Sequence, residues 1–189
     1  MKSIAIFGGT FDPVHLGHLE LVKAARQSED LDQVMFMPCW QSPFKGKTIA
    51  NGQQRYHMLE LAIAELGMGD WATVGDFEIN RETPSYSWQT VAHFREQMPD
   101  VNWHWIVGTD QWRVIDRWAE ADKLRQWLSF IVLTRDGEKV ESRSGWSHRS
   151  VAFEHPASAS EIRADFTKFG ETWLASSVYR FCFENIIYG

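Results

Sequence analysis

Short apolar runs alternate with longer amphipathic segments along this 189-residue chain, and this alternation limits its fold more than any other feature. Five runs have the length of strands, and several are apolar at successive positions, as expected when both faces of a sheet are covered. They are residues 4–7, 34–37, 72–77, 103–107 and 129–133. Between them, apolar side chains recur at helical spacing in segments 16–26, 58–66 and 88–97. This alternation predicts right-handed crossovers and an open parallel sheet with helices on both faces, an α/β fold.

The rest of the chain adds an excursion and a helical end. Asn51-Gly52 is a plausible start for the second helix. Residues 136–150 are polar and predict a surface excursion before a last short strand at 151–153. Helical patterns return at 160–169 and 176–187, and we expect these C-terminal helices to pack beside a Rossmann-like sheet. No internal repeat is visible, so we expect one domain over residues 1–189.

Composition excludes several classes of function. The net charge is −6 and no basic block is present, which disfavours a nucleic-acid partner. No apolar stretch approaches the roughly 20 residues of a membrane helix. Cys39 and Cys182 are far apart and form no metal-binding pair. We therefore expect a cytoplasmic protein with no membrane partner.

The loop at residues 8–18, GGTFDPVHLGH, carries the chemistry. It follows the first predicted strand and leads into a helix, where free backbone N–H groups and the helix dipole attract phosphate. Gly8 and Gly9 allow close approach of the backbone, while His15 and His18 share one face of the first helical turn. Each residue alone is also compatible with a turn, a cap or core packing. A zinc site is disfavoured because no third ligand is obvious nearby.

This loop resembles the signature of the adenylyl- and cytidylyltransferases with a (H/T)-x-G-H motif, here His15-Leu16-Gly17-His18. The form GGTFDPVH is most similar to the nicotinate-nucleotide adenylyltransferase family. Similar motifs follow in the same order, at Gln54-Arg55, 84–87, 108–110 and Trp118. The resemblance implies ATP binding by the loop, including Thr10 and Phe11. It also implies transfer of the AMP moiety to nicotinate mononucleotide, with Mg²⁺ bound together with ATP.

A second family motif, Ile-Ser-Ser-Thr-x-Ile-Arg, is altered here. Residues 157–163 read ASASEIR, which keeps Ser158, Ser160 and Arg163 for the ATP phosphates but places alanine at 157 and 159. The serines are equally explained as helix caps. We also expect Arg163 near a helix N-terminus, where a cation is unfavourable unless an anion is bound. In a further loop, the family commonly has the sequence Pro-Pro-His-Lys. Here Lys45 is present and is expected to contact a phosphate, whereas Phe44 replaces the histidine.

The resemblance also assigns the acceptor end. Trp118 matches the tryptophan that stacks on the pyridine ring, Tyr86 and Ser87 fall where the nicotinate carboxylate is held, and Asp110 falls where a ribose hydroxyl is bound. Core packing is the alternative for Trp118, and we assign Trp105 with several other tryptophans to packing. These residues, all suggested by sequence, form the predicted site. They are Gly8, Gly9, Thr10, Phe11, His15, His18, Lys45, Tyr86, Ser87, Asp110, Trp118, Ser158, Ser160 and Arg163.

The predicted chemistry is an in-line displacement at the α-phosphorus by a phosphate that is already ionised. No general base is needed, so the site must align two anions and supply positive charge. We assign that work to His15, His18, Lys45 and Arg163. Other acceptors, nicotinamide mononucleotide or pantetheine 4′-phosphate, remain open, as does a non-catalytic nucleotide-binding module.

Overall fold

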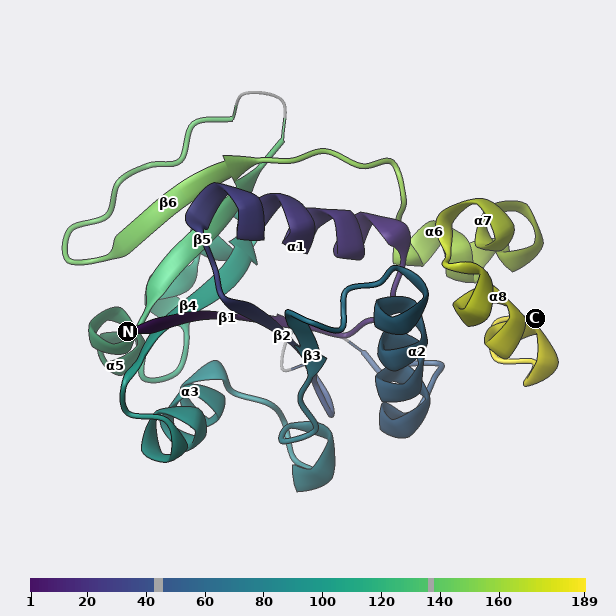
Figure 1. Ribbon diagram of the computed structural model, residues 1–189, viewed down its shortest axis with the longest axis horizontal. Helices are drawn as coiled ribbons and strands as arrows, with labels where there is room; N and C mark the ends of the chain where they lie inside the picture. Colours follow the sequence, from purple (N-terminus) through teal and green to yellow (C-terminus); the bar gives the residue numbers. More distant parts are fainter. Residues whose placement is uncertain (43–45, 136–137) are drawn as a thin grey trace.

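A computed structural model describes residues 1–42, 46–135 and 138–189, and its centre is one six-stranded parallel sheet (Figure 1). The strand order is β3-β2-β1-β4-β5-β6, and every neighbouring pair is parallel. The strands are β1 (Lys2–Gly9), β2 (Gln33–Pro38), β3 (Ala72–Val74), β4 (Val101–Gly108), β5 (Ser129–Thr134) and β6 (Ser147–Ala152). The predicted open parallel sheet is confirmed. Its order is that of the doubly wound dinucleotide-binding folds.

The helices connect these strands and cover both faces of the sheet (Figure 1). The α-helices are α1 (Leu16–Glu29), α2 (Gly52–Glu65), α3 (Ser87–Gln97), α4 (Thr109–Trp112), α5 (Ala121–Trp127), α6 (Ala159–Ala164), α7 (Phe166–Trp173) and α8 (Ser176–Glu184). Two short 3₁₀ helices, η1 (Ile79–Arg81) and η2 (Ile115–Arg117), lie in the connections. Among the described residues, no helix is long and apolar enough to cross a membrane.

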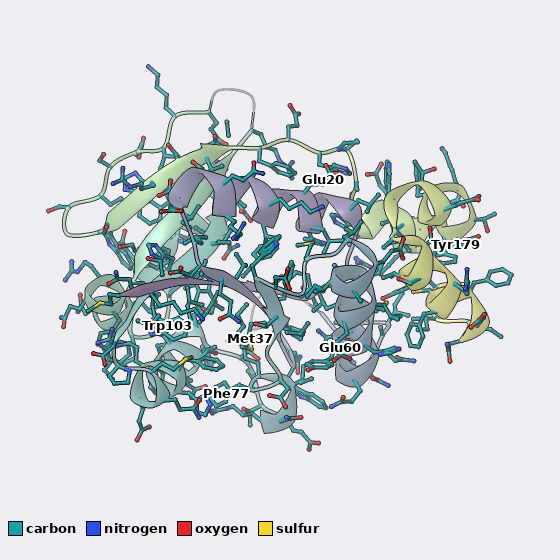
Figure 2. All side chains as sticks on the ribbon, in the orientation of Figure 1. Glu20, Met37, Glu60, Phe77, Trp103 and Tyr179 are labelled. Atoms are coloured by element: carbon teal, nitrogen blue, oxygen red, sulfur yellow. The ribbon has the colours of Figure 1, made fainter. Side chains whose placement is uncertain are left out.

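The sheet separates two hydrophobic cores. One contains Leu19 and Val22 of α1 together with residues of α2 and of the C-terminal helices. The other contains Val91 of α3 and the strand residues Met37 and Trp103, which Figure 2 shows on the α3 side of the sheet. Helices α6 to α8 pack at one side of the sheet next to α2, as the helical patterns at the end of the sequence predicted (Figure 1).

Several element boundaries differ from the sequence-based expectation. β3 ends at Val74 rather than at 77, and β6 begins at Ser147, inside the segment predicted as a surface excursion. β6 lies at the edge of the sheet and most of its side chains are exposed, so its polar composition concealed a strand. The helix start at Asn51 is confirmed, since its side chain accepts a hydrogen bond from the backbone N–H of Gln54. Helices α4 and α5 were not predicted.

Candidate active site

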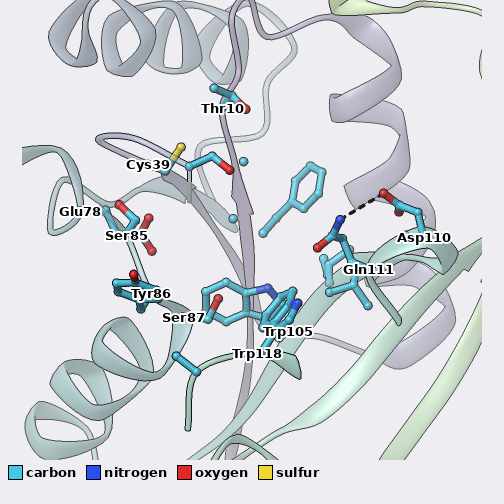
Figure 3. Close-up of a pocket in the computed structure, with 18 of the residues that line it drawn as sticks. Thr10, Cys39, Glu78, Ser85, Tyr86, Ser87, Trp105, Asp110, Gln111 and Trp118 are labelled. Atoms are coloured by element: carbon cyan, nitrogen blue, oxygen red, sulfur yellow. Dashed lines mark hydrogen bonds between the residues drawn. The ribbon is translucent and has the colours of Figure 1, made fainter. Parts of the chain in front are cut away.

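A cavity of about 500 Å³ opens at the carboxyl ends of β1 and β4 (Figure 3). These two strands pair in the middle of the sheet, and the chain winds outward from them in opposite directions. Ligands of doubly wound folds bind at this point, where the strand order reverses. Gly8 and Gly9 from β1 and Gly108 from β4 line the floor of the cavity. The fold therefore places the predicted phosphate loop at the edge of the cavity.

The two glycines of β1 are required by the aromatic rings behind them. A Cβ atom on Gly8 would lie 2.8 Å from Cζ2 of Trp105, and one on Gly9 would lie 2.8 Å from Cζ of Phe11. Thr10 follows them and also lines the cavity. Phe11 has a positive φ of 50°, and its side chain is buried. Its ring is edge-on to that of His18, with centroids 5.2 Å apart, so the side chain of Phe11 supports His18 rather than the cavity wall.

His15 and His18 lie together at the start of α1. His15 is the N-cap residue, and its backbone N–H donates to Nδ1 of His18 at 3.2 Å. The two imidazoles are stacked, with centroids 3.7 Å apart and planes 26° apart. His18 is half-buried and His15 is buried. Neither ring is part of the cavity wall in this structure, so their contact with ATP stays a prediction.

The charge of His15 differs from the sequence-based expectation. Burial and, to a smaller extent, the charge of the neighbouring His155 together lower the pKa of His15 to about 4. His15 is therefore neutral at pH 7 in the ligand-free protein and does not supply positive charge. Its buried Nδ1 has no hydrogen-bond partner among the described residues. The rings of His15 and His155 pack closely against Gly17. A Cβ atom at Gly17 would lie 3.1 Å from Nδ1 of His15 and 2.9 Å from Nδ1 of His155, so a larger residue has no room there.

Arg163 contacts the phosphate loop from the other end of the chain. Its Nη1 donates to the backbone carbonyl of Asp12 at 2.6 Å, and its Nη2 donates to Oγ of Ser160 at 3.5 Å. The expectation that Arg163 starts a helix was wrong, because Arg163 lies in the last turn of the six-residue α6. The hydrogen bond to the carbonyl of Asp12 therefore accounts for the position of the Arg163 side chain, and no anion at a helix start is needed to explain it. Ser158 is the N-cap residue of α6, although its side chain makes no capping hydrogen bond.

The predicted acceptor residues line the other end of the cavity (Figure 3). Tyr86 and Ser87 form the start of α3, and Trp118 follows η2. The ring of Trp118 packs edge-on against Trp105, with centroids 6.3 Å apart, and also joins the core beside α3. Trp118 thus packs against the core and also lines the cavity, and its stacking on a pyridine ring stays a prediction. Asp110 lines the cavity as well, and its carboxylate accepts a hydrogen bond from Nε2 of Gln111 at 3.2 Å. Lys45 lies outside the described residues.

Of the cavity residues that the sequence analysis did not assign to the site, Trp105 and Glu78 are the most informative. Trp105 is 4% exposed and was assigned to packing, yet it forms part of the cavity wall. Glu78 precedes η1 and is buried at 5% exposure, although an acidic residue in a polar segment predicts a surface position. The hydrogen bond that Thr90 donates to Glu78 at 2.6 Å keeps the carboxyl group inside. No sequence signal distinguishes it from a surface acid.

Comparison with known proteins agrees with this geometry. The model of the cytidylyltransferase-like family matches residues 6–165. A probable nicotinate-nucleotide adenylyltransferase from Methylacidiphilum infernorum is 39% identical over 133 residues, which cover 70% of this chain and 64% of that relative. The protein of the same description from Synechococcus is 33% identical over 95% of this chain and 84% of the relative.

Solved structures share the fold at lower sequence identity. The nicotinic acid mononucleotide adenylyltransferase of Plasmodium falciparum, complexed with NaAD, superposes with a TM-score of 0.79 at 17% identity. The match covers 100% of this chain and 98% of that one. These structures show the shared fold, and the family model together with the identity to the curated relatives shows that the chain belongs to the cytidylyltransferase-like family, among its nicotinate-nucleotide adenylyltransferase members.

Proposed function

We propose that this chain transfers the adenylyl group of ATP to nicotinate mononucleotide, giving deamido-NAD and pyrophosphate. One observation carries this proposal. One cavity joins the glycines at the end of β1, whose bare backbone suits a phosphate chain, to Tyr86, Ser87 and Trp118, whose hydroxyl groups and flat ring suit an aromatic carboxylate. We further propose that residues 1–189 work as one cytoplasmic nucleotidyltransferase domain.

ATP lies along the start of α1 in this proposal. The backbone N–H groups of the helix start and the imidazoles of His15 and His18 face its phosphates. Arg163 brings a permanent positive charge to the same loop, through its contact with Asp12. Ser160 in α6 and Ser158, the residue before α6, add hydroxyl groups. Asp110 accepts a hydrogen bond from the ribose.

The reaction is a displacement in which the phosphate oxygen of the acceptor bonds to the α-phosphorus and the bond to pyrophosphate breaks. Since the attacking phosphate is already ionised, the protein needs to hold the two reactants in line and stabilise the charge that develops. His18 donates to the α-phosphate, and the neutral His15 holds His18 in place through the stacked rings. Lys45 and Arg163 supply positive charge.

Mg²⁺ accompanies ATP in this proposal. Mg²⁺ keeps several water ligands and is usually held by substrate phosphates with one or two carboxylates, rather than by an all-protein site. In the part of the chain that the structure describes, no group of three or more His, Cys, Asp or Glu side chains is placed to hold a metal ion. When bound, the ion neutralises charge on the leaving pyrophosphate.

The acceptor occupies the end of the cavity lined by aromatic and hydroxyl groups. The pyridine ring stacks on Trp118. Tyr86 and Ser87, at the start of α3, bind the carboxylate, because free N–H groups and the positive end of the helix dipole meet there. A carboxylate gains more from that position than a neutral amide does, which favours nicotinate over nicotinamide mononucleotide.

A pyrophosphate-release assay with ATP, Mg²⁺ and a panel of acceptors tests the proposal. We expect release with nicotinate mononucleotide, and much less with nicotinamide mononucleotide or pantetheine 4′-phosphate. His18→Ala should lower kcat by about 10²–10³-fold while the protein stays folded. His57→Ala, which removes an exposed imidazole from α2, is the matched control. Release with another acceptor alone would reassign the substrate, and no release with any acceptor would favour a non-catalytic nucleotide-binding module.

A further inference from the structure

Glu78 is a buried carboxyl group at the acceptor end of the cavity, and the proposed reaction gives it no role. Its side chain is 5% exposed and forms part of the cavity wall beside Ser85, as Figure 3 shows. A carboxyl group in such a place is expensive to bury unless hydrogen bonds hold it. Packing alone therefore does not explain a carboxyl group at this position.

The hydrogen bonds of Glu78 and of its neighbour Ser85 connect three segments of the chain. Oγ1 of Thr90 in α3 donates to Oε1 of Glu78 at 2.6 Å, and the side chain of Ser85 is also hydrogen-bonded to the carboxyl group. Oγ of Ser85 accepts from the backbone N–H of Trp40 at 3.2 Å, and its backbone N–H donates to the carbonyl of Gln41 at 3.1 Å. Glu78 thus connects the segment after β2, the loop before α3 and α3 itself.

The geometry makes Ser85 the residue that depends most on this network. Ser85 directly precedes Tyr86 and Ser87, which start α3 and line the cavity. Burial raises the pKa of Glu78 above its usual value, and the hydrogen bonds from Thr90 and Ser85 and the charge of Arg81 offset this increase only in part. The two hydroxyl groups thus stabilise the ionised form inside the wall.

We propose that Glu78 is a positioning residue for the acceptor, which acts through Ser85 to hold the start of α3 at a fixed distance from Trp118. This role rests on the proposed function, because it presupposes that the pyridine ring and its carboxylate bind between these residues. In the proposed function ATP binds at the start of α1, beyond Gly8, Gly9 and Thr10 at the opposite edge of the cavity, so its binding should not depend on Glu78.

Steady-state kinetics of Glu78→Gln test this role. The glutamine amide oxygen still accepts from Thr90, but its NH₂ group cannot accept from the hydroxyl of Ser85. We expect the KM for nicotinate mononucleotide to rise about tenfold, as the loss of a hydrogen bond to a charged group predicts. The KM for ATP should change less than about twofold. Glu82→Gln, an exposed acid in the same loop, is the matched control and should behave like the parent protein.

A double-mutant cycle and a second pair of variants separate positioning from general destabilisation. Ser85→Ala should raise the same KM, and adding it to Glu78→Gln should have little further effect, since both break one contact. If variants of Glu78 fail to fold, Thr90→Val and Thr90→Ser address the same network from α3. Valine should raise the acceptor KM, and serine, which keeps the hydroxyl group, should restore it.

An unchanged acceptor KM in Glu78→Gln and Thr90→Val would overturn this role, as would equal increases in both KM values. Fully additive effects of Glu78→Gln and Ser85→Ala would exclude action through Ser85. If the parent protein released no pyrophosphate with any acceptor, the proposed function would fail first, and the positioning role would fail with it. The two failures are therefore distinguishable by the activity of the parent protein.

Discussion

Replacing Arg55 by methionine should destabilise the protein and weaken ATP binding together. Arg55 lies in α2, is 1% exposed, and its guanidinium bonds to carbonyl oxygens where three segments meet. Nη1 donates to Thr10 at 2.6 Å, Nη2 to Cys39 at 2.7 Å and Trp40 at 3.3 Å, and Nε to Ala50 at 3.2 Å. The residue thus ties the phosphate loop to the end of β2.

The size of the effect follows from the two short bonds. Hydrogen bonds to a charged group contribute about 1.5–3 kcal/mol each, so the bonds to Thr10 and Cys39 together represent about 3–6 kcal/mol. Methionine fills much of the volume and removes the desolvation of the charge, which offsets part of this loss. We expect a net loss of about 3–4 kcal/mol. In a chain of this length, such a loss lowers Tm by about 6–16 °C.

Thermal and urea unfolding measure the loss, and the KM for ATP reports on the phosphate loop. Arg55→Lys should recover less than half of the stability, because an ammonium group cannot span both carbonyls as the planar guanidinium does. Arg180→Met, which removes an exposed arginine from α8, is the control for the change in net charge. A decrease in Tm below about 2 °C, or one equal to that of the control, would refute the reasoning.

Three further results are expected. Trp118→Ala should raise the KM for nicotinate mononucleotide about tenfold to a hundredfold with little change for ATP, because it removes a stacking platform; equal changes for both substrates in initial-rate assays would contradict this. The free energy of unfolding should fall by up to about 3 kcal/mol as the pH falls from 6.5 to 4, because His15 takes up a proton in the unfolded chain over this range but stays neutral in the folded protein, where its pKa is about 4. Urea unfolding at several pH values should show a smaller change with pH in His15→Asn. Tyr188→Phe should lose about 2 kcal/mol in urea unfolding, because its hydroxyl group donates to Oδ1 of the buried Asp12 at 2.7 Å; an unchanged midpoint would exclude that contribution.

The sequence predicts the centre of the sheet better than its edges, for a physical reason. β1, β2, β4 and β5 are covered on both faces, so their sequences are apolar at successive positions and stand out from the helices. β6 is an edge strand with mostly exposed side chains, and its sequence, SHRSVA, resembles a loop. Its pairing with β5 depends on backbone hydrogen bonds, which leave no side-chain pattern.

In the candidate site, too, the sequence predicts some features, whereas others depend on the folded structure. The common location of Gly8, Tyr86 and Trp118 follows from the rule that the carboxyl ends of parallel strands meet at one edge of a sheet. Trp105 was assigned to the core because a tryptophan in a buried strand looks the same whether or not a cavity opens beside it. The neutral state of His15 depends on its burial in the fold and on the charge of His155, far away in the chain, and no local motif encodes it.

Asp12 shows why a short motif alone does not make this site. Its carboxylate accepts from the backbone N–H groups of Ile49 and Ala50, at 2.9 and 3.0 Å, and from the hydroxyl group of Tyr188. Its carbonyl accepts from Arg163. One residue in the middle of the phosphate loop is therefore held by segments 37 to 176 positions away along the chain. Because these contacts all hold the loop on which ATP is proposed to bind, changes near the C-terminus should affect ATP binding. The proposed acceptor side should instead depend on the separate network around Glu78.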